Sequence, residues 1–225
     1  YLSFINEVAR PRKYQINIVG LGDVGGILAT GIKLLGADTV STIGIYDKDD
    51  NKIKRWLYEL SAIKDIEAPL SPKIISLKED ELFNCDMFVF CVSVGVPQVG
   101  SEGKDVRMVQ FEGNKKVVSH YAQEARRVGF KGVFAVVSDP VDLLCKAVFL
   151  ASNSSPDGSL DLCGIPSHKI RGYGLGVMNG RASYFAVDQG IYPDYQRDGR
   201  VFGPHGEGLI AANSINNYDD SLSSL

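Results

Sequence analysis

The chain has 225 residues, of which 44% are hydrophobic, and its formal net charge is −3. This length and composition suit a globular protein with one or two packed cores. No run of lysine and arginine indicates nucleic acid, and no apolar stretch is long enough to span a membrane or begins like a signal peptide, so we expect neither kind of partner.

Strands and helices alternate through the first two thirds of the chain. Short apolar segments predict strands at residues 14–19, 40–47, 73–77, 86–94 and 131–138. Helices are predicted after the first, second, fourth and fifth of these strands, and the last two helices cover residues 105–128 and 139–152. The inward-facing positions are Ile27, Leu28, Ile32 and Leu35 in the first helix and Ile53, Leu57 and Leu60 in the second. This alternation predicts an α/β fold built on a doubly wound parallel sheet of the Rossmann type.

The polar loop "SNSSPDGS" at residues 152–159 marks a change in composition and predicts a domain boundary. We therefore expect a first domain over residues 14–151 and a second, α+β domain over residues 160–225. In the second, the segment "GYGLGVMNGRASYFA" (172–186) turns helical, with Ala182, Phe185 and Ala186 on one face.

The four cysteines show no C-x-x-C spacing. Their pattern is typical of buried free thiols in a reducing cytoplasm rather than of disulfides, and no metal site is expected. The four are Cys85, Cys91, Cys145 and Cys163.

The most specific local motif is a G-x-G-x-x-G that follows the first strand and opens the first helix. It reads Gly20-Leu21-Gly22-Asp23-Val24-Gly25. Glycines at this spacing permit a tight turn and a close approach of backbone N–H groups to a pyrophosphate at the helix N-terminus. Asp47 ends the second strand, where an acid holds the adenosine ribose hydroxyls and repels a 2′-phosphate, so the motif predicts NAD rather than NADP. The alternative is an ordinary glycine-rich turn with a solvated acid at a strand end.

Several segments in the same order resemble the lactate/malate dehydrogenase family over residues 15–215. They are "INIVGLGDVG", "VRMVQFEGN" (106–114), "VVSDPVDLL" (136–144), "GYGLGVMNGRASY" and "GPHGEG" (203–208). The resemblance implies reversible hydride transfer between NAD and C2 of a small 2-hydroxy or 2-oxo acid. It also implies a homodimer or homotetramer, and cofactor contacts from the glycine loop and from Val94, Gly95 and Val137.

The resemblance assigns a role to three polar residues. Arg181 matches the arginine that binds the substrate carboxylate through its planar guanidinium. Arg107 matches the loop arginine that polarises the ketone, and His205 matches the proton donor. Each has a plainer alternative, since Arg181 can lie along a helix surface and His205 can be a turn residue.

Two positions depart from the family pattern. Met178 stands where the family has the aspartate that orients the histidine, and a thioether is only a weak acceptor. Asp139 stands where the family has asparagine beside the nicotinamide. Two interpretations of Asp139 remain open, a carboxylate that partners His205 in place of the missing aspartate, and a simple N-cap for the helix that begins at Pro140.

The predicted lid, residues 92–107, is longer than its family counterpart by three residues. Ser101 falls nearest the position that selects the substrate side chain, with Gln98 and Lys104 as alternatives. Because the family continues well beyond its histidine segment, residues 160–225 are expected to be only the first part of the substrate domain. A different class of function is a catalytically impaired NAD-binding sensor or scaffold, which the changes at Met178 and Asp139 would favour.

Overall fold

The computed structural model of the protein describes residues 12–64, 71–94, 106–204, 208–218 and 221–224. Its strands are β1 (Tyr14–Val19), β2 (Val40–Tyr46), β3 (Lys73–Ser76), β4 (Met87–Phe90), β5 (Val133–Val136), β6 (Ile170–Gly172), β7 (Arg200–Phe202) and β8 (Ile210–Ala212). Its α-helices are α1 (Asp23–Leu35), α2 (Asp50–Ala62), α3 (Val106–Arg127), α4 (Val141–Asn153), α5 (Leu175–Asp188) and α6 (Tyr192–Asp198). The five predicted strands and the four helices that follow them are all present.

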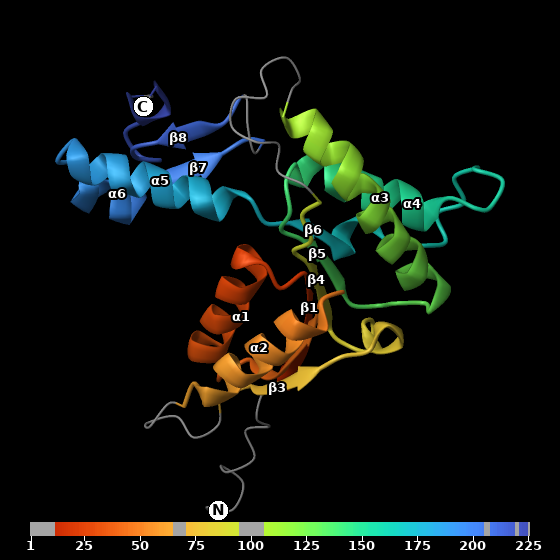
Figure 1. Cartoon of the computed structure of the whole chain (residues 1–225). Coiled ribbons are helices and arrows are strands. Elements are labelled where there is room, and N and C mark those ends of the chain that lie inside the picture. The colour runs from red at the N-terminus through yellow and green to blue at the C-terminus, as the bar shows by residue number, and fades with distance from the viewer. Residues whose placement is uncertain (1–11, 65–70, 95–105, 205–207, 219–220, 225) are drawn as a thin grey trace, which may run out of the picture.

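Six parallel strands form one sheet in the order β3-β2-β1-β4-β5-β6 (Figure 1). Ile18 in the central strand β1 pairs with Ile45 of β2 and with Val89 of β4. The order reverses between β1 and β4, so the carboxyl ends of these two strands diverge into helices on opposite faces. The predicted doubly wound parallel sheet is confirmed.

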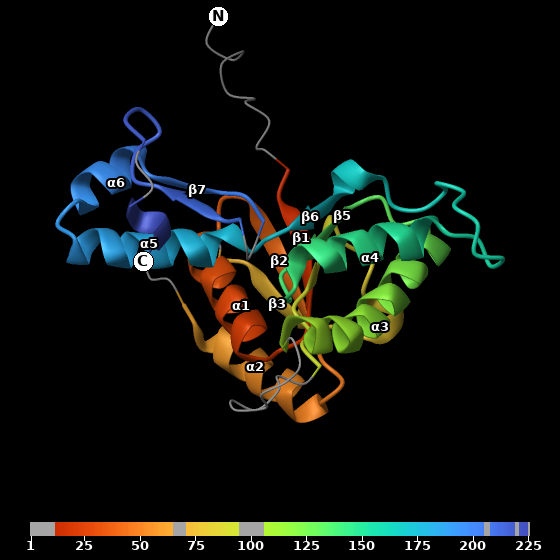
Figure 2. The same cartoon turned by 90° about the horizontal axis from the view of Figure 1, so that it is seen from above.

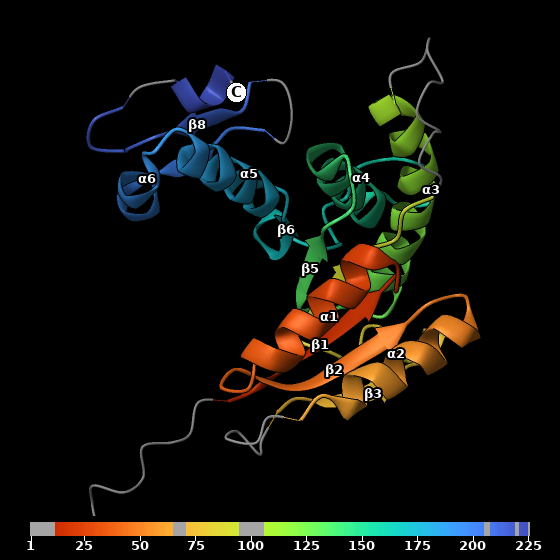
Figure 3. The same ribbon diagram turned by 60° about the vertical axis from the view of Figure 1, so that its left-hand side comes forward.

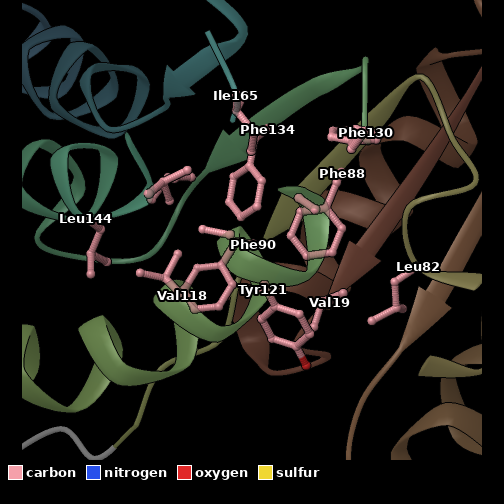
Figure 4. Packing of buried hydrophobic residues seen from close by; sticks show 14 of the residues in the cluster. Val19, Leu82, Phe88, Phe90, Val118, Tyr121, Phe130, Phe134, Leu144 and Ile165 are labelled. Carbon is pink, nitrogen blue, oxygen red and sulfur yellow. The ribbon is translucent and has the colours of Figure 1, made fainter. Parts of the chain in front are cut away.

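Helices cover both faces of the sheet, with α1 and α2 on one side and α3 and α4 on the other (Figure 1). The α3 and α4 side holds an aromatic cluster in which the rings of Phe88 and Phe134 lie 4.8 Å apart, and Tyr121 of α3 packs against Phe88 (Figure 4). The α1 and α2 side is aliphatic, around Ile18, Ile43 and Ile45.

The predicted inward face of α1 is half wrong. Leu28 and Ile32 are half-buried, but Ile27 is 71% exposed and Leu35 is 89% exposed. The buried face consists instead of Gly25, Gly26, Ala29 and Lys33. Small residues let this helix lie close to the sheet, so its bulky side chains project outward.

The sheet extends past the expected domain boundary. Strand β6 lies beyond the loop at residues 152–159 and pairs with β5, so residues up to Gly172 belong to the first sheet. Beyond it, α5, α6 and the antiparallel pair β7–β8 gather to one side of the sheet (Figures 2 and 3). They share a small cluster of their own, made of Ala182, Ala186, Tyr195, Ala211 and Leu222. The predicted inward positions of α5 agree with this cluster.

All four cysteines are free thiols, as predicted. Burial raises the pKa of Cys85 and of Cys91 to about 12, and that of Cys145 to about 11, so these thiols are protonated at neutral pH. Cys163 is exposed, which contradicts the expectation that all four are buried, because it lies in an irregular segment between α4 and β6.

Candidate cofactor and substrate site

The three glycines of the loop between β1 and α1 have different structural roles. Gly20 has a φ of +94°, and a Cβ there would lie 2.7 Å from the backbone nitrogen of Val92. At Gly25 a Cβ would lie 1.9 Å from the carbonyl oxygen of Gly20, so only glycine lets α1 begin this close to the loop. No described residue places an atom within 4 Å of the Cβ position of Gly22, so its backbone has open space beside it in the described part of the chain. This division of roles suits a loop that turns tightly, packs closely and leaves room for a pyrophosphate.

Asp47 follows β2 and is fixed by the backbone around it. Its Oδ2 accepts a hydrogen bond from the Leu21 N–H at 2.7 Å, and its Oδ1 accepts one from the Asp49 N–H at 3.0 Å. The side chain is 15% exposed, and the Lys52 Nζ lies 4.0 Å from Oδ2. The carboxylate is thus held beside the glycine loop, where an acid binds ribose hydroxyls.

The loop and Asp47 open onto a cleft of about 460 Å³ at the carboxyl ends of β1, β2 and β4. Of the predicted cofactor residues, it is lined by Gly20, Gly22, Asp23, Val24, Asp47 and Val94. Gly25 packs behind the loop, and Val137 lies after β5, where its N–H donates to the Phe90 carbonyl at 3.0 Å. Gly95 lies outside the described residues.

A larger hollow of about 950 Å³ lies at the opposite, amino ends of the strands, near Arg12 and Asp86. It contains none of the predicted site residues. Ligands of open α/β sheets bind at the carboxyl ends of the strands, at the point where strand order reverses. The smaller cleft is therefore the candidate site.

Trp56 is a part of the site that sequence reasoning missed. Its indole Nε1–H donates to the Leu21 carbonyl at 3.1 Å, and its ring fills the space that a Cβ on Gly26 would occupy. Together with Asp47, it occupies both backbone polar groups of Leu21. The visible signal was a lone tryptophan one helical turn from Ile53 on the inward face of a predicted helix.

Asn114 of α3 is the second residue that was missed. It is 1% exposed; its Oδ1 accepts from the Val94 N–H at 2.7 Å, and its Nδ2 donates to the Asp139 carbonyl at 2.8 Å. One amide therefore joins the end of β4 to the start of α4. The sequence feature that could have identified Asn114 is its position, one turn before Val117 and Val118 on a mainly apolar helix face.

Asp139 is exposed and precedes a cis bond to Pro140. The N-cap position of α4 is held by Pro140, whose own side chain makes no capping hydrogen bond. The helix thus begins one residue later than the N-cap interpretation of Asp139 assumes, and both interpretations of Asp139 stay predictions.

Arg181 lies on α5, exposed, with its Nη1 3.9 Å from the Sδ of Met178. The methionine that replaces the family's aspartate thus contacts the predicted substrate arginine one turn along the same helix. Arg107 lies in the first turn of α3, although only its backbone is described. Ser101 and His205 lie outside the described residues.

The comparisons with known proteins agree with this geometry. Residues 14–159 match the family model described as "lactate/malate dehydrogenase, NAD binding domain". The chain belongs to this family. The matched domain binds NAD, and the glycine loop and Asp47 fit that cofactor, because open backbone faces the cleft and a fixed carboxylate lines it.

Individual relatives of this lactate/malate dehydrogenase family member are distant. The chain is 26% identical over 206 residues to the L-lactate dehydrogenase B chain of Bos taurus, covering 91% of itself and 56% of that relative. It is 25% identical over 200 residues to an L-lactate dehydrogenase of Staphylococcus saprophyticus, covering 88% of itself and 56% of that relative. The chain thus spans a little over half the length of these relatives.

Solved structures share the fold. A lactate dehydrogenase from a Medee basin deep-sea metagenome library superposes with a TM-score of 0.71 at 20% identity, over 93% of this chain and 60% of that one. Malate dehydrogenase from Plasmodium falciparum superposes with a TM-score of 0.66 at 16% identity, over 88% of this chain and 56% of that one.

Two further observations concern other ligand classes. The described residues bring together no group of three His, Cys, Asp or Glu side chains suited to a metal ion. No helix among them is long and apolar enough to cross a bilayer.

Proposed function

We propose that this protein is an oxidoreductase that transfers a hydride reversibly between NAD and C2 of a small 2-hydroxy or 2-oxo acid. The observation that carries the proposal is the cleft at the β1/β4 switch point, where the glycine loop meets a fixed Asp47. The family membership and the arginine on α5 support it further. One relative in the structural comparison, from Eimeria maxima, is described with NADH and oxamate, a small anion of the proposed type.

The bound nicotinamide supplies or accepts the hydride, and the protein supplies charge and a proton. Arg181 binds the substrate carboxylate, for which its guanidinium offers two parallel N–H donors. Arg107 polarises the C2 carbonyl and stabilises the negative charge that develops on its oxygen. His205 gives a proton to that oxygen during reduction and takes it back during oxidation.

Within this proposal, Asp139 partners His205 in place of the missing aspartate at Met178. The requirement is an Asp139 carboxylate oxygen within about 4 Å of a His205 ring nitrogen. A carboxylate at that range raises the pKa of a histidine and keeps it protonated for reduction at neutral pH.

The remaining parts of the proposal concern organisation. We place the start of the substrate region after Gly172, since the first sheet ends there. Ser101, in the lid, is our candidate for selecting the substrate side chain. The assembly is a homodimer or homotetramer of a cytoplasmic protein, and sedimentation that shows only monomer at micromolar concentration would contradict the assembly.

The decisive experiment is a screen of pyruvate, oxaloacetate and branched 2-oxo acids, with NADH oxidation followed by absorbance. Turnover of one of these acids supports the dehydrogenase. NADH binding without turnover of any 2-oxo acid contradicts it and favours the second candidate, an NAD-binding sensor or scaffold. The changes at Met178, whose Sδ lies 3.9 Å from the Arg181 Nη1, and at Asp139 favour this second candidate.

A further inference from the structure

Tyr121 is a buried tyrosine whose ring and hydroxyl have different surroundings. It lies on α3 and is 3% exposed. Its ring packs against Phe88, at a centroid distance of 5.6 Å, and meets the Phe90 ring edge-on at 6.1 Å. Figure 4 shows its oxygen pointing away from both rings. The ring therefore belongs to the core, whereas the hydroxyl leaves it.

No described residue forms a hydrogen bond with this hydroxyl, although buried tyrosine O–H groups normally find a partner. Among the described residues, every fully buried side-chain oxygen or nitrogen has a hydrogen-bond partner. The Tyr121 hydroxyl has none, so it is not fully buried and reaches open space. The other buried tyrosine among the described residues, Tyr195, does have a partner, because its hydroxyl donates to the Asn179 Oδ1 at 2.7 Å.

The open space on one side of Tyr121 is the cofactor cleft. Tyr121 lines it together with Val117, one turn earlier on the same face of α3. Burial raises the pKa of Tyr121, and the nearby Tyr46, Glu79 and Asp47 raise it further. The hydroxyl is therefore within electrostatic reach of the carboxylate that marks the ribose position.

The order of groups along NAD identifies what would meet this hydroxyl. The glycine loop receives the pyrophosphate and Asp47 receives the adenosine ribose, so the group beyond the ribose is the adenine. We propose that the Tyr121 hydroxyl hydrogen-bonds the polar edge of the adenine ring, with Val117 against its face. A hydroxyl both donates and accepts, which suits a base edge that carries an amino donor next to ring-nitrogen acceptors.

Tyr121 also lines a second cavity of about 320 Å³, together with Glu79 and His120. A hydroxyl directed there would bind water and make no contact with the cofactor. The two alternatives predict opposite results for cofactor affinity when the hydroxyl alone is removed.

The test compares Tyr121→Phe with the parent by calorimetric titration of NADH, AMP and reduced nicotinamide mononucleotide. Loss of one hydrogen bond predicts a dissociation constant about three- to tenfold higher for NADH and for AMP. Affinity for the mononucleotide, which lacks the adenosine half, stays unchanged. The melting temperature does not fall, because the ring contacts remain and the hydroxyl bonds no described group.

Tyr195→Phe is the matched control. It removes a hydroxyl that does bond a protein group, so we expect lower stability and unchanged NADH affinity. The proposal is overturned if Tyr121→Phe binds NADH within twofold of the parent, or if the mononucleotide loses affinity equally. Because the readout is binding alone, it is independent of whether any 2-oxo acid is reduced, and so of the proposed function.

Discussion

The Leu21 N–H donates to the Asp47 carboxylate at 2.7 Å, so the acid that we propose binds the adenosine ribose also anchors the middle of the glycine loop. The proposed ribose recognition and the geometry of the loop thus depend on one side chain. A substitution that removes the carboxylate entirely therefore disturbs both. Asparagine removes the charge and keeps an oxygen for the Leu21 N–H, but its amide nitrogen replaces the oxygen that accepts from the Asp49 N–H.

We predict that the parent binds NADH more tightly than NADPH, because Asp47 repels a 2′-phosphate. Asp47→Asn keeps an oxygen for the Leu21 N–H but removes the charge, so the preference for NADH falls about tenfold or more, as expected when a close like charge is removed. Lys48 and Lys52, which line the same cleft, then attract the 2′-phosphate. Fluorescence titration with both cofactors measures the ratio.

Asp47→Ala is the control for the acceptor. It removes the charge and the hydrogen bond together, so affinity for both cofactors falls. Equal or tighter binding of NADPH by the parent would show that Asp47 does not select the cofactor.

The second prediction concerns the other polar group of Leu21. Trp56→Phe keeps an aromatic ring over Gly26 but removes the indole N–H that donates to the Leu21 carbonyl. We expect NADH affinity to fall by about 0.5–1.5 kcal/mol, the usual net value of one hydrogen bond. Calorimetric titration measures this change, and unchanged affinity would contradict a role for Trp56 in setting the loop.

Gly26→Ala is the companion variant, because its Cβ would lie 1.9 Å from the Trp56 ring. Overpacking of this kind destabilises a protein by about 1–3 kcal/mol. Thermal unfolding should therefore report a lower melting temperature for Gly26→Ala than for Trp56→Phe.

The sequence predicted the sheet well because its evidence is local. Apolar runs such as residues 131–138 predict strands without any tertiary information, and the glycines between residues 20 and 25 predict a turn in the same way. Strand β6 was missed because its three residues are too short to show a period, and it is a strand only through its pairing with β5. Ile27 and Leu35 of α1 were wrongly predicted to face inward for a related reason. The buried face of α1 depends on a tertiary contact, the packing of the Trp56 ring against Gly26.

Site residues that belong to a sequence motif were predicted. Site residues whose role depends only on tertiary contacts were missed. The glycine loop and Asp47 are recognisable by spacing. Asn114 matters because it bridges Val94 and Asp139, which lie 20 and 25 residues from it in the chain, and no local pattern encodes that bridge.

This bridge gives the third prediction. Asn114→Leu removes the hydrogen bonds to the Val94 N–H and to the Asp139 carbonyl, and each costs about 0.5–1.5 kcal/mol of unfolding free energy. Urea denaturation measures the loss. Asn114→Asp keeps the acceptor for Val94 but turns an oxygen toward the Asp139 carbonyl, so it should also destabilise. Wild-type stability in both variants would refute the bridge.

The fourth prediction concerns acid stability. The Arg126 guanidinium binds Asp161 through two hydrogen bonds, at 2.8 and 2.5 Å, and holds the pKa of that carboxyl at about 2. In the unfolded chain the Asp161 carboxyl has its ordinary pKa of 3.8, so at acidic pH it binds a proton more readily than it does in the folded protein. The stabilisation is therefore complete above about pH 4 and is lost as pH falls toward 2.

We expect Asp161→Asn to be less stable than the parent at neutral pH and to lose less stability between pH 4 and 2. Glu124→Gln, which breaks an exposed pair with Arg127 within α3, is the control and should have a smaller effect. Chemical denaturation at several pH values measures both. Parallel pH profiles for Asp161→Asn and the parent would contradict the assignment.

The last prediction addresses Met178 and Arg181, whose Sδ and Nη1 lie 3.9 Å apart. Met178→Asp restores the family's carboxylate but also places it three residues before Arg181 on α5, at a spacing where opposite charges pair. If Asp139 already partners His205, the new carboxylate brings no catalytic gain and competes with the substrate for Arg181, so KM rises while kcat stays level. Asp139→Asn alone lowers kcat by about tenfold or more, because the proton donor loses its orienting group. In the double variant the restored aspartate turns to His205, and kcat recovers. Met178→Leu, which keeps the volume without a charge, should leave KM unchanged. Steady-state kinetics with the acid that the screen identifies measures all four variants, and an Asp139→Asn variant as active as the parent would remove Asp139 from the mechanism.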